Sequence, residues 1–127
     1  DLNILNNYKN NFEDLNTNFD NQNINFYLNF IVDQLFKANK YFNDQEPWKR
    51  KDDKKRLNTI VYVSLEVIRK ISILLYPIIP ESSLKALNIF NIKETDIDFS
   101  TILNNNYLSP GKNINKIEIL FNKIKND

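Results

Sequence analysis

Apolar residues recur at helical spacing along most of this chain, and their order predicts a series of helices. The first series predicts a helix over about residues 2–16 and consists of Leu2, Leu5, Tyr8, Phe12 and Leu15. The second alternates steps of three and four residues and consists of Ile24, Tyr27, Leu28, Ile31, Leu35, Ala38 and Phe42. We expect Asp20 or Asn21 to cap this second helix. It should end before Pro47, because the residue preceding a proline is excluded from the α region.

The strongest helical signal follows Pro47. Asp52 or Asp53 is the expected N-cap, because a carboxylate both accepts the free amide hydrogens and suits the positive end of a helix. The apolar positions of this helix are Leu57, Ile60, Val61, Ser64, Leu65, Ile68, Ile71, Leu74 and Leu75. The helix should stop at Tyr76–Pro77.

A shorter helix should begin at Pro80, which suits the first helical position, and should face inward through Leu84, Leu87 and Phe90. Residues 98–104 predict one or two further turns, and the chain from Pro110 onward predicts a loop, an extended segment and a terminal turn. A chain with one glycine is poorly suited to β-hairpins. The pattern therefore predicts an all-α fold, a bundle of four to five helices with an irregular C-terminal tail.

Length and charge limit the class of protein. The chain has 127 residues and a net charge of +1, which suits one domain over residues 1–127 and requires any nucleic-acid surface to be local. No signal peptide is visible, and the apolar runs are too short for a membrane span. Because the chain has no cysteine, we expect a cytoplasmic protein with no membrane partner. The chain does not begin with Met, so we expect it to be part of a longer protein.

Enzyme chemistry is excluded mainly by the residues that the chain lacks. It contains no His and no Cys, so the commonest general base, metal ligand and nucleophile are missing. A single glycine cannot form a glycine-rich phosphate loop. Asp52, Asp53 and Glu66 occupy positions typical of helix caps or surface charges. We therefore expect no catalytic residue and no metal site in this chain.

The segment Glu46–Lys51 has the most unusual local chemistry. It places the only tryptophan, Trp48, directly after Pro47 at a junction between two helices. The six basic residues among positions 49–56 are Lys49, Arg50, Lys51, Lys54, Lys55 and Arg56. An exposed indole beside cations can stack on an RNA base while the cations meet phosphates. From the pattern alone, an indole that plugs the end of the bundle is the favoured alternative.

Three other polar residues permit two interpretations each. Asn39 can hydrogen-bond a base or fasten the Pro47 loop, and the structural role is favoured. Lys40 can add to a phosphate-binding surface. Arg69 lies among apolar residues, where an arginine usually pairs with an acid across the bundle or extends to water, and an RNA contact is the less favoured alternative.

Three segments, in order, resemble the anticodon-binding domain of methionyl-tRNA synthetases. Residues 38–49 resemble its A-N-x-Y-x-x-x-x-x-P-W signature. Residues 65–80 resemble its long helix, which carries an Arg and ends in L-x-P-x-x-P. Residues 110–112 and 119–124 resemble its closing P-G-H-K and P-L-F-P-R-I. Together they cover roughly residues 26–125 and favour this family over the synthetases for isoleucine, valine, leucine or cysteine.

The resemblance implies a helical domain that binds the CAU anticodon loop of tRNA(Met) for a methionine–tRNA ligase. It implies that Trp48 stacks on an anticodon base and that Pro47 orients it. From the local pattern we expect Lys49, Arg50 and Lys40 to meet phosphates, and Asn39 is a further RNA-binding candidate. It also implies that the tail, residues 108–127, packs toward the catalytic domain through Leu120 and Phe121.

Several features of the family are absent from this chain. The Asn/Arg pair that reads anticodon bases would precede Asp1. Lys112-Asn113 stands where His-Lys is usual, Asn122 replaces Pro, and Lys123 replaces Arg. The catalytic H-I-G-H and K-M-S-K-S motifs require His and Met, which are absent. The resemblance therefore implies that ATP and any zinc bind in a catalytic part outside this chain, with no cofactor here.

Two alternatives to this assignment remain open at this point. One is a protein-interaction bundle, and the other is the anticodon domain of a sister synthetase.

Overall fold

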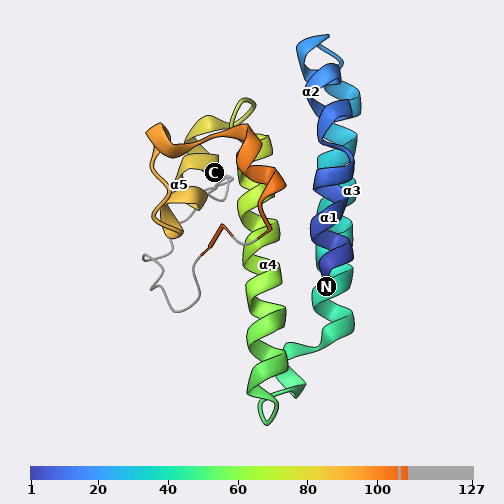
Figure 1. Cartoon of the computed structure of the whole chain (residues 1–127), viewed down its shortest axis with the longest axis vertical. Coiled ribbons are helices and arrows are strands. Elements are labelled where there is room, and N and C mark those ends of the chain that lie inside the picture. The colour runs from blue at the N-terminus through green and yellow to red at the C-terminus, as the bar shows by residue number, and fades with distance from the viewer. Residues whose placement is uncertain (106, 109–127) are drawn as a thin grey trace, which may run out of the picture.

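The computed structural model describes residues 1–105, 107 and 108, which form five α-helices and three 3-10 turns (Figure 1). The elements are α1 (Leu2–Asn10), α2 (Phe12–Asp20), α3 (Ile24–Gln45), η1 (Pro47–Lys49), α4 (Lys54–Leu75), α5 (Pro80–Ile89), η2 (Glu94–Asp96) and η3 (Phe99–Leu103). This part of the chain contains no strand. The predicted all-α bundle is therefore confirmed.

Helix α4 lies at the centre of the bundle (Figure 1). Helix α3 packs against it in the antiparallel direction, while α1 and α2 follow the length of α3 and α5 packs against the opposite side of α4. The buried Tyr27 hydroxyl donates a hydrogen bond to the Leu74 carbonyl, and so joins the start of α3 to the end of α4. The α3–α4 junction lies at the far end of the molecule from this bond.

The core is a continuous set of aliphatic and tyrosine side chains contributed by every α-helix, by the loop after α5 and by η3. Its buried members are Leu5, Tyr8, Leu15, Tyr27, Ile31, Val63, Val67, Ile71, Ile73, Leu74, Leu87, Ile92 and Ile102. Full burial of such side chains contributes about 1.5–3 kcal/mol each relative to exposure. Within the described residues, no helix combines the length and the apolar character that a bilayer span requires.

The helix boundaries follow local signals. Asp53 caps α4 by accepting a hydrogen bond from the Arg56 amide at 3.0 Å, as predicted, and α4 ends at Leu75 as predicted. Pro80 opens α5 as expected. The cap predicted at Asp20 or Asn21 is wrong. Helix α2 continues to Asp20 and the chain then turns through Gln22 at φ 59°, so the cap of α3 is Asn23.

The single helix predicted over residues 2–16 is also wrong, because α1 and α2 are separated at Asn11. The Asn11 side-chain amide donates to the Asn7 carbonyl at 2.7 Å, in place of the main-chain bond that would continue α1. Asparagine competes with helical hydrogen bonding in this way more readily than most residues. The prediction of one or two turns at residues 98–104 is confirmed, because η3 lies there.

The faces of the two long helices differ from the predicted ones. On α3, Leu35 and Phe42 are exposed to 43% and 41%. Gln34 is buried instead and accepts a hydrogen bond from Asn7 at 2.9 Å. On α4, Val61 and Ile68 are exposed, and the buried apolar residues include Val63 and Val67. The reason is that α1 flanks α3, whereas α4 is packed by α3, α5, α1 and η3.

Three other residues that were predicted to face inward are not fully buried. Ile24 on α3 is exposed, and Leu84 and Phe90 around α5 are half-buried. Leu87 is fully buried as predicted, and Ala86 is buried beside it. The apolar pattern therefore predicted the helices, but the neighbouring helices determine which apolar side chains are buried.

The least expected part of the core is charged. Glu66, which the sequence placed at the surface, is fully buried, and so are Arg69 and Lys70. Arg69 pairs with Glu66 through bonds of 2.8 and 3.0 Å, so its acid lies one turn earlier on the same helix instead of across the bundle. It also donates to the carbonyls of Thr101 and Asn104, the latter at 2.7 Å.

The same cluster continues to the end of the described chain. The Lys70 ammonium donates to the Ile102 carbonyl and, at 2.8 Å, to the side chain of Asn105. The Leu108 amide donates to Glu66 at 2.7 Å. The guanidinium of Arg69 lies 4.6 Å from the centre of the Tyr107 ring. These contacts fasten residues 101–105, 107 and 108 to the middle of α4.

Replacing Arg69 by methionine should cost about 3–5 kcal/mol of unfolding free energy, because the buried Glu66 carboxylate loses its charged partner. Urea unfolding followed by circular dichroism measures this loss. Adding Glu66→Gln to Arg69→Met should recover part of the loss, because the unpaired charge is removed. An exposed control, Lys54→Met, should change the stability little. A cost below about 1 kcal/mol for Arg69→Met would contradict a buried, unscreened ion pair.

Lys70 should make stability depend on pH. The pKa of Lys70 is lowered from 10.5 to about 8, mainly by burial and also by the neighbouring Arg69 charge, while Glu66 opposes both effects. The folded chain gives up this proton near pH 8 and the unfolded chain only near 10.5, so stability should rise within that window. Relative to Lys70→Met, the wild-type unfolding free energy should rise by about 1–2 kcal/mol from pH 7.5 to 9.5. A flat or falling difference in urea titrations would be inconsistent with this pKa.

Candidate nucleic-acid interface

The candidate interface is built on the sharp turn between α3 and α4. Helix α3 ends at Gln45, and Glu46 adopts the left-handed conformation with φ 46° and ψ 58°. Its amide donates to the Phe42 carbonyl at 3.2 Å and closes the helix. Pro47 is buried and starts the short turn η1. The fixed φ angle of proline suits the first position of a helical turn. Trp48 therefore projects from a backbone fixed on both sides.

Arginine side chains hold this turn in place. Arg50 donates from its side chain to the Gln45 carbonyl and from its backbone amide to the Pro47 carbonyl, the latter at 3.1 Å. From the start of α4, Arg56 donates to the Gln45 side chain at 2.6 Å and to the Asp1 carboxylate at 2.5 and 2.9 Å. The turn is thus tied to both helices that it joins.

The Trp48 side chain is half exposed, at 50% of its full accessible surface. Its indole packs against Phe42, with ring centres 6.0 Å apart and planes inclined by 56°. The interpretation of Trp48 as a plug in the core, which the pattern alone favoured, is therefore wrong. The structure leaves a large aromatic surface accessible at the end of the bundle.

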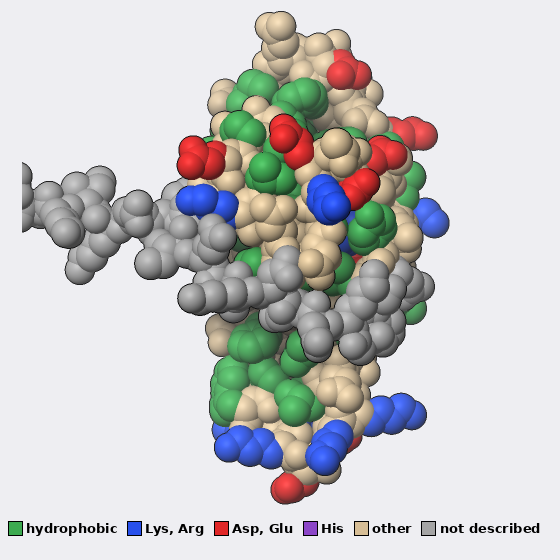
Figure 2. All heavy atoms as spheres, turned by 90° about the vertical axis from the view of Figure 1, so that its left-hand side faces the viewer, with side chains coloured by type: hydrophobic (Ala, Val, Ile, Leu, Met, Phe, Trp, Pro, Cys, Tyr) green, Lys and Arg blue, Asp and Glu red, His purple; other side chains and the backbone are tan. Residues whose placement is uncertain are grey.

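The six basic residues of segment 49–56 divide into two groups. Lys49 pairs with Glu46 at 2.9 Å, while Arg50 and Arg56 hold the turn. The ammonium groups of Lys51, Lys54 and Lys55 form no ion pair with any described residue. Figure 2 shows Lys and Arg side chains gathered at the lower end of the molecule together with acidic ones. The unpaired lysines are therefore the cations most available to a phosphate, although the local pattern favoured Lys49 and Arg50 for this role.

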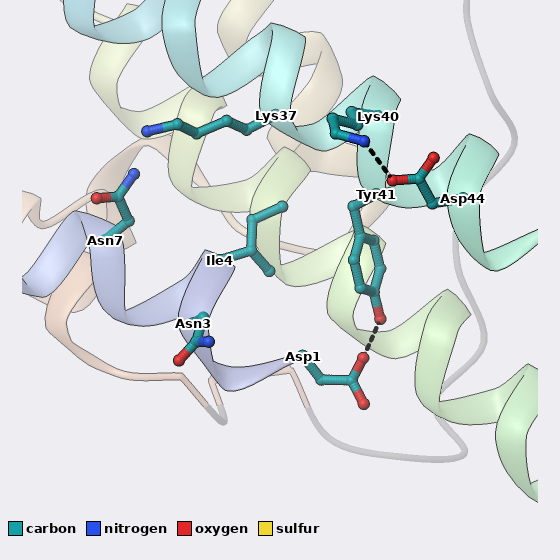
Figure 3. Close-up of a pocket in the computed structure, with 8 residues that line it drawn as sticks. All are labelled: Asp1, Asn3, Ile4, Asn7, Lys37, Lys40, Tyr41 and Asp44. Carbon is teal, nitrogen blue, oxygen red and sulfur yellow. Dashed lines mark hydrogen bonds and ion pairs between the residues drawn. The ribbon is translucent and has the colours of Figure 1, made fainter.

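Asn39 and Lys40 do not join this cluster. Asn39 is exposed, and within the described chain no hydrogen bond joins its side chain to the Pro47 loop, so the favoured structural role is wrong. Lys40 pairs with Asp44 at 2.7 Å. It lines an open depression of about 640 Å³ between α1 and α3 (Figure 3).

This depression carries charges of both signs. Lys37 and Lys40 line it, and so do Asp1 and Asp44. The Tyr41 hydroxyl donates to Asp1 at 2.6 Å across the depression (Figure 3). Burial raises the pKa of Tyr41, and Arg56 opposes this effect. The balance of charges gives the depression no preference for an anion. In the described residues, no group of three or more His, Cys, Asp or Glu residues is placed to hold a metal.

Comparison with known families identifies the domain. A family model described as the anticodon-binding domain of methionyl-tRNA ligase matches residues 4–127. The chain belongs to this family. Methionine–tRNA ligase of Brucella suis is 38% identical over 85 residues, which are 66% of this chain and 16% of that protein. The corresponding enzyme of Mycobacterium leprae is 36% identical over 90 residues, 67% of this chain and 17% of that protein.

An archaeal relative supports the same assignment. Methionine–tRNA ligase of Pyrococcus furiosus is 36% identical over 91 residues, which are 71% of this chain and 12% of that protein. The chain thus spans no more than about a sixth of the length of these curated relatives. No solved structure gave a significant match. The tail residues Leu120 and Phe121, and the motif residues from Pro110 onward, lie outside the described residues.

Replacing Glu46 by glycine should make the folded chain more stable. A non-glycine residue in the left-handed region costs roughly 1–2 kcal/mol, and glycine avoids this cost. The substitution also removes the exposed ion pair between Glu46 and Lys49, which contributes little to stability. We therefore expect Glu46→Gly to raise the unfolding free energy by about 1 kcal/mol. Glu46→Ala removes the same carboxylate but keeps a Cβ atom, so it should give no gain. Equal stability of the two variants in urea titrations would contradict the left-handed turn.

Proposed function

We propose that this domain binds the CAU anticodon loop of tRNA(Met) through Trp48, and thereby positions the tRNA for ATP-dependent aminoacylation with methionine. The observation that carries this proposal is the half-exposed indole on a fixed turn beside unpaired lysines. Stacking of an aromatic side chain on an unstacked base is worth about 1–3 kcal/mol. Single-stranded loops are the part of an RNA whose bases can be splayed out for this contact.

The cations beside the indole supply the second part of the proposed contact. Lys51, Lys54 and Lys55 can meet phosphates without first breaking an ion pair inside the described chain. Lys49 and Lys40 can exchange their exposed carboxylate partners for phosphates at small cost, because such surface pairs are worth only about 0–1 kcal/mol. With a net charge of +1, the attraction is confined to this end of the domain, and binding should weaken as salt rises.

The remaining chemistry belongs, in this proposal, to a catalytic domain outside the chain. The relatives named methionine–tRNA ligase are several times longer than their match with this domain. ATP, methionine and any zinc would be bound there, in a cytoplasmic enzyme. The tail from residue 108 onward would pack toward that catalytic domain, with Leu120 and Phe121 as docking residues. The fastening of Leu108 to Glu66 supports a defined starting point for the tail.

A second candidate function, protein interaction, is favoured by apolar side chains on the outer faces of the long helices. Phe36 is 71% exposed, with Val32 and Leu35 beside it on α3. Val61 and Ile68 are exposed on α4. Exposed apolar groups of this kind are typical of surfaces that another protein covers. This surface and the Trp48 turn can serve different partners.

Trp48→Ala should weaken binding of a CAU anticodon stem-loop by roughly 5- to 100-fold, the equivalent of the stacking energy. A titration of fluorescently labelled RNA measures the dissociation constant. Trp48→Phe should retain much of the affinity, and Phe36→Ala, which removes another exposed aromatic ring, should retain all of it. A stem-loop with a different anticodon tests the preference for CAU.

Unchanged affinity of Trp48→Ala would exclude Trp48 from the RNA contact. A loss with Phe36→Ala but not with Trp48→Ala would place the RNA on the outer face of α3. Binding of both stem-loops with equal affinity would contradict recognition of CAU by this domain alone.

A further inference from the structure

We infer that Phe42 is a positioning residue that holds the Trp48 indole in one orientation, with part of its surface free for a base. This inference rests on the proposed function. It concerns a residue that the A-N-x-Y signature leaves unspecified, since Phe42 stands at one of its variable positions. The helical pattern assigned Phe42 to the core, but Phe42 lies at the surface with 41% of its accessible area exposed.

The backbone brings the two rings together. Phe42 lies in the last turn of α3, and its carbonyl accepts the Glu46 amide that closes the helix. The left-handed Glu46 and the buried Pro47 then reverse the chain, so that Trp48 returns toward Phe42. The ring centres are 6.0 Å apart and the planes are inclined by 56°. Aromatic pairs favour separations of about 4.5–7 Å with tilted or edge-on planes.

The fixed turn alone does not fix the indole. Hydrogen bonds to the backbone at Gln45, Pro47 and Arg50 hold the main chain around Trp48, but none of them involves its side chain. Among the described residues, Phe42 is the only aromatic side chain that contacts the indole. Its contact restricts rotation of the indole, while half of the Trp48 side chain stays exposed.

Restricting the indole before RNA binds should strengthen stacking. A side chain that rotates freely must lose rotamer entropy when a base packs against it, and a side chain already held in place loses less. The benefit of Phe42 should therefore require Trp48. A direct contact between Phe42 and RNA would not have this requirement, so a double-mutant cycle separates the two roles.

The first measurement needs no RNA. Because Trp48 is the only tryptophan in the chain, time-resolved fluorescence anisotropy reports on its motion alone. Phe42→Ala should increase the amplitude of the fast, local rotation of the indole by at least about twofold, since its neighbouring ring is lost. Phe42→Tyr keeps a ring and should behave as wild type. Phe36→Ala is the matched control, because it removes an exposed phenylalanine from the same helix away from Trp48.

The second measurement is the affinity for the CAU stem-loop. Phe42→Ala should weaken binding by about two- to tenfold, the range expected for loss of one aromatic pair. In a Trp48→Ala background, the same substitution should have no further effect. Circular dichroism checks that each variant is folded, and Phe42→Leu replaces Phe42→Ala if the latter unfolds.

The outcomes separate this inference from the proposed function. Unchanged anisotropy in Phe42→Ala, or a Phe42→Ala loss of affinity that persists without Trp48, overturns the positioning role. Weaker binding by Trp48→Ala together with unchanged binding by Phe42→Ala also overturns it, but leaves the proposed function intact. Full affinity in Trp48→Ala overturns both, because there is then no stacking contact to position.

Discussion

The buried ion pair between Glu66 and Arg69 is the constraint on which the upper half of the bundle depends. A charge in the interior is tolerated only when its hydrogen-bonding groups are satisfied. Arg69 has more donors than Glu66 can accept, and the remaining ones reach the carbonyls of Thr101 and Asn104. The chain after α5 therefore returns across α4 and supplies the acceptors that the buried guanidinium needs. The path of η3 is in this sense dictated by one arginine.

The opposite end of α4 follows a different principle. There the chain satisfies its polar groups at a tight turn, through Arg50 and Arg56, and leaves aromatic and cationic side chains in water. An RNA-binding surface needs this combination, because bases require an exposed ring and phosphates require cations that are not already paired. One helix thus carries structural charges at its centre and, at its first turn, the cations offered to a partner.

The sequence by itself determined the local features. Proline fixes φ and restricts its predecessor, so Pro47 and Pro80 located a helix end and a helix start within one or two residues. The carboxylate of Asp53 capped its helix as expected, because capping involves only neighbouring residues along the chain. The family was indicated by three motif segments in order, the first of which is the spacing of A-N-x-Y to P-W. That spacing also indicated the junction at which the candidate site lies.

Only the tertiary structure decided which side chains are covered. Helical periodicity gives a stripe, but the direction in which a stripe faces depends on which helices pack against it. Leu35 and Phe42 became surface residues, and Glu66 became a core residue, because α1 and η3 occupy sides of the bundle that no local pattern predicts. The pattern favoured a place in the core for Trp48 and was wrong for the same reason. Its exposure follows from a left-handed turn that returns the indole against Phe42, and that contact exists only in the folded chain.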